Sequence, residues 1–398
     1  MRNIIIILFI LLPVPFLFIN YAPFEDINSQ LYITKHAIVL LGMLLCIIYK
    51  SPFKKVFKYE KPLIFNFFLF ISYCITNWIL LSNFNFKYLS YIFSIIIIVL
   101  LSISIGKMHK GFTLFKYIYY SLSILLISSI AYSLLFDINL NSNWTVLDGN
   151  VKTRWTFGFL HPGFLGSYAM LTGILSAYLI QSKQLKKRHA IITIFSFILI
   201  ILTNTRNSFV ALSIFLLVSY SSVTFKLFKI GLISSLVSIL IILNVNPYLL
   251  NVISSGRYQL WIKHFEYNYE SFNYFFGTGL GNARRIEYLL NNGEYYDQNT
   301  IFHLDNYYFE VFLQFGVLGI IFLFLIIRSI FNMIKKMKNI RMKRDAFAIL
   351  FVILFFSFFD SSFLTTGNLI SVILWPLLIF QLYQSRPNFQ LGKIKSGN

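Results

Sequence analysis

Cationic and acidic side chains gather in one polar stretch, residues 246–305, of an otherwise apolar chain. Its candidates for chemistry are Arg257, Arg284, Arg285, His303 and Asp305. The planar guanidinium of Arg presents N–H donors that match phosphate and carboxylate oxygens. A carboxylate or an imidazole beside such cations can accept a proton from a hydroxyl group as a general base. The stretch therefore predicts a site for a polar, anionic substrate.

Charged residues at the edges of apolar segments extend this set. Arg206 lies in a short polar hinge, 203–208, where a cation is costly unless it faces a cavity or a partner, or snorkels to headgroups. Asp360 lies near the end of a later apolar run, where an acid is a functional candidate or a helix cap. Arg154 precedes His161, which could be a base, a hydrogen-bonding contact for substrate or a packing residue.

A glycine-rich motif, 277–281, lies inside the polar stretch. Its spacing is not that of a dinucleotide-binding fingerprint, and no strand is predicted before it. Gly277 and Gly279 could serve a tight turn, or their amides could form a nest that approaches phosphate oxygens. Upstream of the motif, a short helix is predicted that carries Trp261 and Phe265 on one face and is suited to the membrane interface.

The charged residues of the stretch also have simpler explanations. Arg257 could pair with a glutamate of the same stretch, and Arg284 and Arg285 could form a solvated face. Asp305 could cap the helix that is predicted to follow it. These alternatives stay open at the level of the residues.

The elements that would position these residues are membrane helices. The chain is 57% hydrophobic and 12% charged, whereas a soluble domain is about a quarter charged. Apolar runs of about 17–25 residues recur, and in lipid the backbone must satisfy its own hydrogen bonds, which favours helices over alternating barrel strands. We predict an all-α integral membrane protein of about 12 transmembrane helices. The predicted helices lie near residues 4–20, 31–49, 63–81, 88–106, 115–136, 158–180, 190–203, 207–222, 230–245, 306–327, 346–364 and 367–384.

The placement of charge predicts the topology. Most of the 34 Lys and Arg residues, but only Glu60 and Asp345 among the 14 acids, fall on one side of these helices. This positive-inside pattern places both termini in the cytoplasm and explains the net charge of +20 without nucleic acid. Residues 1–245 then hold helices 1–9, residues 246–305 form one large extracytoplasmic loop between helices 9 and 10, and residues 306–398 hold helices 10–12 and a basic cytoplasmic tail.

Cofactor and redox chemistry have no sequence signal. Cys46 and Cys74 lie inside apolar segments, so neither a disulfide nor a metal site is expected, and no cofactor is predicted. The first apolar run lacks a small-residue cleavage site, and we expect it to stay as a helix. No internal repeat is found, which weakly disfavours a secondary transporter.

Four short signatures, in order, resemble the membrane family of O-antigen ligases and O-antigen or capsular polysaccharide polymerases, over residues 150–325. They are Arg154 with Gly158-Phe159-Leu160-His161-Pro162 and Gly166; Thr203-Asn204-Thr205-Arg206-Asn207-Ser208; Gly256-Arg257 with Trp261 and Phe276-Gly277-Thr278-Gly279; and Asp305-Asn306-Tyr307-Tyr308-Phe309 with Gly316. Asp305 stands where the ligase branch has His, with His303 two residues earlier, and Gly163 stands where Asn is more usual. The first departure favours a polymerase over a ligase.

The resemblance implies a metal-independent glycosyltransferase, multi-pass in the bacterial plasma membrane, whose active site faces the extracytoplasmic side. Its donor would be a glycan on undecaprenyl pyrophosphate, and its acceptor a sugar hydroxyl of a second lipid-linked repeat unit. Arg206 and Arg257, with Arg154, would hold the pyrophosphate and stabilise its charge, and Asp305 or His303 would be the base. The other expected substrate contacts are His161, Arg284, Arg285, Gly277, Gly279 and Asn306.

Other functions stay open beside the polymerase. A ligase would share every feature except the acceptor. A flippase for lipid-linked oligosaccharides also needs cations at membrane depth, but spread through a central cavity. A structural or sensory protein would not explain why Arg is enriched on the predicted outer side. Expected partners are the lipid-linked oligosaccharide, membrane lipids, and chain-length regulator and flippase proteins, with no nucleic acid.

Overall fold

Most of the chain can be placed. The computed structural model describes residues 2–49, 61–81, 89–108, 111–145, 151–220, 257–269, 272–280, 287–288, 295–296, 306–360 and 363–385.

Long apolar helices dominate the described part of the protein. Six of them are long and apolar enough to cross a membrane: α3 (Asn28–Tyr49), α4 (Lys61–Leu81), α5 (Leu89–Gly106), α6 (Gly111–Phe136), α7 (Pro162–Gln181) and α13 (Tyr307–Lys335). The predicted class, a multi-pass helical membrane protein, is confirmed to this extent.

Shorter elements complete the described structure. The helices are α1 (Arg2–Leu11), α2 (Pro13–Phe18), α8 (Ala190–Leu202), α9 (Arg206–Tyr220), α12 (Arg257–Asn268), α14 (Ile340–Ser357) and α15 (Leu369–Gln384), with 3-10 turns η1 (Ala22–Ile27) and η3 (Lys187–His189). The strands are β1 (Asn141–Thr145), β2 (Val151–Trp155), β3 (Glu287–Tyr288) and β4 (Tyr295–Tyr296), paired as antiparallel β1–β2 and β3–β4.

Several sequence predictions need correction. The described chain is mostly helical, as predicted, but β1 and β2 form a hairpin in the loop before the sixth predicted helix, which the sequence did not predict. The single helix predicted at 4–20 is divided at Leu12, where Pro13 begins α2 and removes a backbone donor. The predicted helix 346–364 is displaced toward the N-terminus, since the side chain of Asn339 accepts a hydrogen bond from the amide of Met342 and begins α14 earlier.

The total of 12 helices stays a prediction, because the ninth, at 230–245, lies outside the described residues. The boundary of the polar stretch at 246 lies outside them as well. The predicted short helix of the polar stretch is present as α12.

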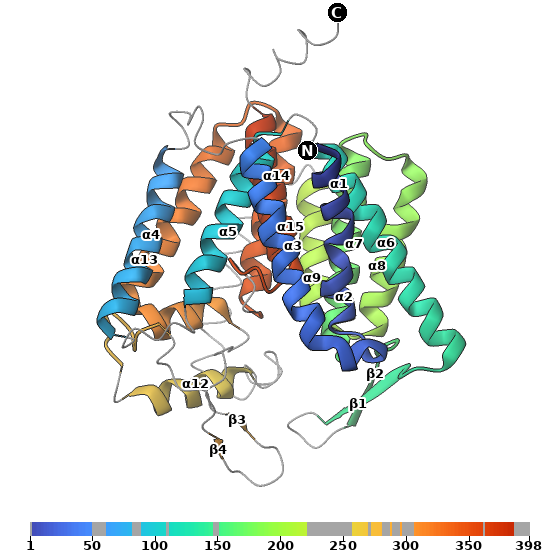
Figure 1. Ribbon diagram of the computed structural model, residues 1–398, viewed down its shortest axis with the longest axis horizontal. Helices are drawn as coiled ribbons and strands as arrows, with labels where there is room; N and C mark the ends of the chain where they lie inside the picture. Colours follow the sequence, from blue (N-terminus) through green and yellow to red (C-terminus); the bar gives the residue numbers. More distant parts are fainter. Residues whose placement is uncertain are drawn as a thin grey trace, which may run out of the picture.

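The bundle has two distinct ends (Figure 1). The β1–β2 hairpin, α12 and the β3–β4 pair lie together at one end, called the hairpin end below. At the opposite end α1 begins and α15 ends. The described parts of the two loops predicted on the outer side therefore share one end of the bundle, away from the first residue of α1 and the last residue of α15. Which side of a membrane each end faces stays a prediction.

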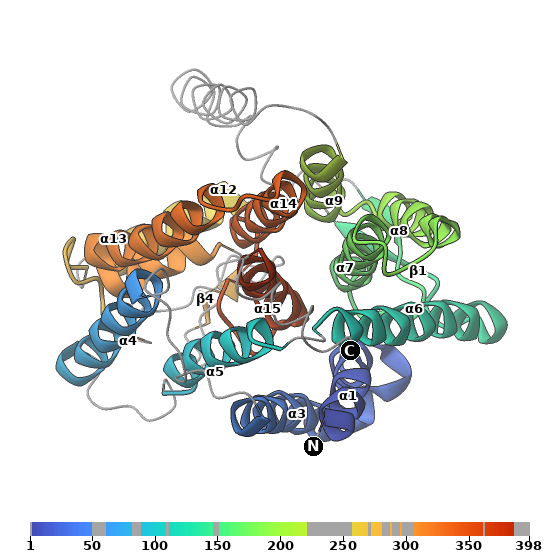
Figure 2. The ribbon, with the colours of Figure 1, turned by 90° about the horizontal axis from the view of Figure 1, so that it is seen from above.

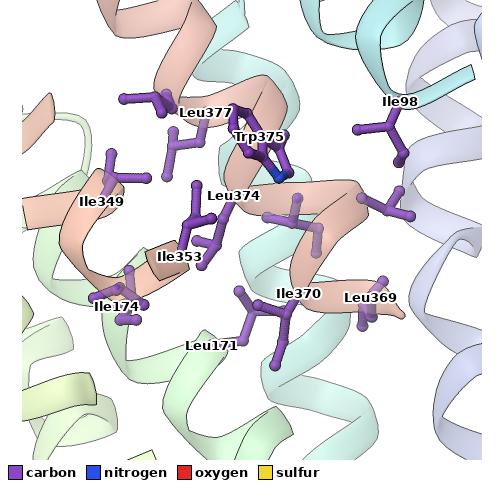
Figure 3. Close-up of a cluster of buried hydrophobic side chains, with 14 of the residues drawn as sticks. Ile98, Leu171, Ile174, Ile349, Ile353, Leu369, Ile370, Leu374, Trp375 and Leu377 are labelled. Carbon is purple, nitrogen blue, oxygen red and sulfur yellow. The ribbon is translucent and has the colours of Figure 1, made fainter. Parts of the chain in front are cut away.

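The centre of the bundle is α15, which is buried all round. Figure 2 shows this helix between α5, α7 and α14. Leu374 and Trp375 of α15 lie among Ile98 of α5, Ile174 of α7 and other apolar side chains (Figure 3). A helix that is apolar on every face is covered either by lipid or by other helices, and every residue of α15 is buried by its neighbours. The ends of the helices around this packed centre form the candidate site.

Candidate functional site

A pocket of about 360 Å³ opens at the hairpin end, where α7 and α9 begin and α14 ends. Its lining is Arg154, His161, Gly163, Phe164, Ser167, Asn204, Thr205, Arg206, Asn207, Ser208, Phe356, Phe359 and Asp360. The structure thus brings together Arg154, His161 and Arg206, which are separated by up to 52 positions in the chain. This volume is within the range of small-molecule sites, about 300–1,000 Å³.

Arg206 is positioned by the sharp turn between α8 and α9. Asn204 adopts a left-handed conformation with φ 50°, which Asn tolerates better than most side chains. The hydroxyls of Thr203 and Thr205 lie 2.9 Å apart and brace the turn. Gly166 of α7 approaches Thr205 so closely that any larger side chain would collide with it. The turn leads directly into α9, whose first residue is Arg206. The side chain of Arg206 is exposed.

Arg154 is carried into the pocket by strand β2. The strand is followed by Phe157 (φ 46°) and Gly158 (φ 81°), whose left-handed conformations turn the chain back toward the bundle. The amide of Thr156 donates to the carbonyl of Leu140 at 2.9 Å and closes the base of the hairpin. Arg154 is half-buried, so its position depends on the hairpin as well as on the helices.

His161 is the N-cap of α7. Its Nδ1 accepts a hydrogen bond of 2.9 Å from the amide of Gly163, and Pro162 takes the first helical position. Because Nδ1 accepts, a neutral His161 carries its proton on Nε2. Its predicted role as a substrate contact is not tested by these contacts, but a role in beginning α7 is visible.

Helix dipoles reinforce the charge of the two arginines. The N-termini of α7 and α9 both line the pocket, through His161 and Gly163 in one case and Arg206 and Asn207 in the other. Helix N-termini present free N–H groups and a partial positive charge, which favour bound anions. Two helix N-termini and two arginines around one pocket can hold a group with concentrated negative charge.

Asp360 is the acid of this pocket. It is half-buried just beyond the end of α14, and the side-chain amide of Asn368 donates to its Oδ1 at 3.5 Å. Asn368 also caps α15, since its Oδ1 accepts from the amide of Ile370 at 2.9 Å. The carboxylate is therefore held near the arginines by the start of the central helix.

Several predicted site residues cannot be placed. Asp305, His303, Arg284 and Arg285 lie outside the described residues. Arg257 begins α12, but its side chain is likewise outside the description. Their predicted roles stay predictions.

Asn306 lies just before α13 and is buried. Its Oδ1 accepts a hydrogen bond of 3.0 Å from the amide of Phe309, so it caps the helix. Capping was the simpler explanation considered for Asp305, and the structure assigns it to the next residue.

The amides of the glycine motif are used inside the protein. The amide of Gly277 donates to the carbonyl of Asn273 at 2.7 Å, and the amide of Gly279 to that of Gln314 at 3.1 Å. This is a structural role of the kind expected for a turn. A phosphate contact at either glycine stays a prediction.

α12 reaches the same region through its aromatic face. Trp261 meets the ring of Phe358 edge-on at 5.8 Å, next to Phe359 and Asp360 of the pocket. Arg257, the first residue of α12, lies one helical turn before Trp261. The helix that carries Arg257 is therefore packed against the segment that carries Asp360.

Sequence reasoning missed several residues of the pocket. Asn207, Ser167 and Phe359 were not proposed as site residues. Asn207 directly follows Arg206 in the sequence, and this position next to a candidate residue could have indicated it. Phe359 had none, because one more aromatic residue in an apolar helix is not distinctive.

The fold is that of a multi-pass helical membrane protein, and a pocket lined by two arginines and two helix N-termini lies at one end of its bundle. Residues 191–324 match the family model described as O-antigen ligase. The match confirms, over these residues, the resemblance drawn from the motifs, and it supports a ligase or polymerase type of function at the level of the family. No curated protein matches the chain.

Proposed function

We propose that the protein is a polymerase that joins lipid-linked polysaccharide repeat units of a capsule, an exopolysaccharide or an O-antigen, at the extracytoplasmic face of a bacterial plasma membrane. The donor is a glycan on undecaprenyl pyrophosphate, and the acceptor is a sugar hydroxyl of a second repeat unit. The observation that carries this proposal is the pocket in which Arg154, Arg206 and two helix N-termini come together.

The reaction is a displacement at the anomeric carbon of the donor sugar. The acceptor oxygen forms a bond to that carbon, the bond from carbon to pyrophosphate oxygen breaks, and undecaprenyl pyrophosphate leaves with the electron pair. Arg206 and Arg154, with Arg257, stabilise the negative charge that grows on the leaving group. No nucleotide is consumed, since the donor already contains the activated bond.

The acceptor hydroxyl must lose a proton as it reacts. Asp305 and His303 are the proposed bases, as the sequence motifs imply. Asp360 is a further candidate, because it lines the pocket with both arginines. A carboxylate within hydrogen-bonding reach of the acceptor hydroxyl can take its proton in the transition state.

A ligase is the second candidate, favoured by the family description itself. It would use the same pocket and donor but transfer the glycan to lipid A core or to a protein. Asp305 in place of the ligase His favours the polymerase. A flippase is less favoured, because the described arginines of the site gather at one end of the bundle, where transfer needs them, instead of along a path across it.

The test compares glycan length in cells that carry Arg206→Ala, Arg257→Ala or a control, Arg328→Ala. Arg328 is exposed on α13 and does not line the pocket. We expect single repeat units in the first two strains and long polymer in the control, with the same level of the protein in all three strains on a blot. Long polymer that stays on the undecaprenyl carrier would identify a ligase. Lipid-linked units that accumulate on the cytoplasmic side would identify a transporter and overturn the site.

A further inference from the structure

α13 is broken inside its apolar length. Gly316 has φ 63° and ψ −161°, far from helical values, although helical residues continue on both sides. A break of this kind frees the carbonyls before it and the amides after it from their helical partners. Within a membrane these groups must find other partners in the protein.

The segment 273–280 supplies these partners. The amides of Thr278 and Gly279 donate to the carbonyls of Leu313 and Gln314, at 2.8 and 3.1 Å. In return, the amide of Val317 donates to the carbonyl of Tyr274 at 2.9 Å. We call this arrangement, residues 273–280 across residues 313–318, the clasp.

The clasp requires glycine at both of its contact points. Gly277 has φ 74°, and a Cβ there would collide with the backbone of Gln314 and Phe315. A Cβ on Gly316 would lie 2.5 Å from the backbone of Phe275. The two glycines let the two backbones touch, because a residue without a Cβ allows the closest approach between chain segments.

α4 completes the clasp through two side chains. The amide nitrogen of Asn77 donates to the carbonyl of Phe276 at 2.9 Å, and its Oδ1 accepts from the amide of Leu280 at 2.8 Å. The hydroxyl of Tyr73 donates to the carbonyl of Phe315, at the break itself, at 2.7 Å. Asn77 is 3% exposed, so its side chain is buried in the protein, and Tyr73 is half-buried.

The clasp joins α12 to the first part of α13. Phe272, which follows α12, contacts Phe312 with ring centroids 5.1 Å apart. Phe265 of α12 stacks on the same ring at 6.4 Å, and Trp261 contacts Phe309 at 6.4 Å. α12, the clasp and the start of α13 therefore form one packed unit, and Trp261 holds that unit against Phe358 beside the pocket.

We propose that Asn77 is a positioning residue of the transfer reaction. This inference rests on the proposed function. Asn77 bonds both ends of the segment 276–280 and so holds the packed unit in place. This unit carries Arg257, at the start of α12, and includes the N-terminus of α13. Without it, the pocket still binds the donor through Arg154 and Arg206, but the groups brought by the unit are misplaced. A displacement of about 1 Å at a reacting centre can lower the rate a hundredfold.

Asn77→Ala is the test variant, and Asn66→Ala is its matched control. Asn66 lies on the same helix and also bonds α13, since its amide nitrogen donates to the carbonyl of Leu325 at 3.0 Å and to the hydroxyl of Ser329 at 2.7 Å. It touches neither the clasp nor the pocket. Both proteins are purified in lipid nanodiscs, and hydrogen exchange is measured by mass spectrometry on the peptide that contains residues 273–280.

We expect faster exchange of this peptide in Asn77→Ala and unchanged exchange in Asn66→Ala. With a lipid-linked repeat unit as donor, turnover in Asn77→Ala falls about tenfold or more while KM for the donor changes less than about threefold. Tyr73→Phe, which loses one hydroxyl, gives a smaller change in the same direction and replaces Asn77→Ala if that variant does not fold.

Unchanged exchange in Asn77→Ala would overturn the inference whatever the enzyme makes. Faster exchange with normal turnover would reduce Asn77 to a structural residue and overturn the positioning role. An equal loss of turnover in Asn66→Ala would do the same. Failure of the proposed function gives a different result: the wild-type protein would not join lipid-linked repeat units, while the exchange result at the clasp would stand.

Discussion

The pocket and the clasp are both built where a helical path through the bundle is interrupted, but they resolve the interruption in opposite ways. At the turn between α8 and α9, helix ends face a cavity with Arg206 and Asn207 exposed to it. At Gly316, the freed backbone groups pair with a second chain segment and are buried. Irregular backbone in a membrane is tolerated when it lines a cavity or is buried in protein. The first arrangement forms a binding pocket, and the second holds two chain segments together.

This difference predicts which changes each region tolerates. The pocket depends on charge, so a neutral side chain of similar size should disable it and leave the fold intact. The clasp depends on contact between backbones, so one added methyl group should destabilise it. A variant that breaks this pattern would show that the two regions are not separable.

Arg206→Gln is expected to have the largest effect on transfer. It keeps a polar side chain and loses the charge, so transfer by the purified protein should fall about a hundredfold or more, as when one donor to a developing anion is removed. The melting temperature should stay within about 2 °C, since surface substitutions change stability little. Arg206→Lys keeps the charge but loses the paired donors, so its transfer activity should lie between those of the wild-type protein and Arg206→Gln. Full activity in Arg206→Gln would show that the pocket does not carry the reaction.

Gly277→Ala is expected to act on the fold of the clasp. The left-handed backbone and the collision with Gln314 each cost about 1–3 kcal/mol, so thermal unfolding in detergent should occur at a clearly lower temperature. Gly42→Ala, on α3, is the control, because a Cβ there meets the ring of Phe9 at an ordinary 3.6 Å. Equal melting temperatures for the two variants would contradict the close approach at the clasp.

His161 separates capping from chemistry. His161→Ala removes the cap of α7 and should cost about 0.5–2 kcal/mol of stability, whereas His161→Asn can still accept from the amide of Gly163. If capping is its role, His161→Asn keeps the stability and most of the transfer activity. A large loss of transfer in both variants, with normal melting of His161→Asn, would assign it a direct role with substrate.

The sequence predicted the helices and the arginines better than the contacts between distant chain segments. Apolar length is a property of each segment alone, so the six long helices were found, and Arg206 was singled out because a cation in an apolar region is costly. The break at Gly316 was not predicted, because it depends on contact with residues 273–280. A glycine motif alone does not say which backbone it touches. Asn77 gave no signal either, since one amide in an apolar helix has several explanations.

Ile353→Val is expected to have the smallest effect, and it tests whether the pocket is independent of the core beneath it. Ile353 is buried against α15 (Figure 3). Phe356, one turn later on the same helix, lines the pocket. Loss of one methylene should lower stability by about 0.5–1.5 kcal/mol. Because the end of α14 is also held by Trp261 against Phe358, transfer per folded molecule should stay unchanged. Melting in detergent and transfer normalised to folded protein measure the two quantities separately. A fall in transfer that follows the loss of stability would mean that the packing of α15 sets the shape of the pocket, and that the pocket is not independent of the core.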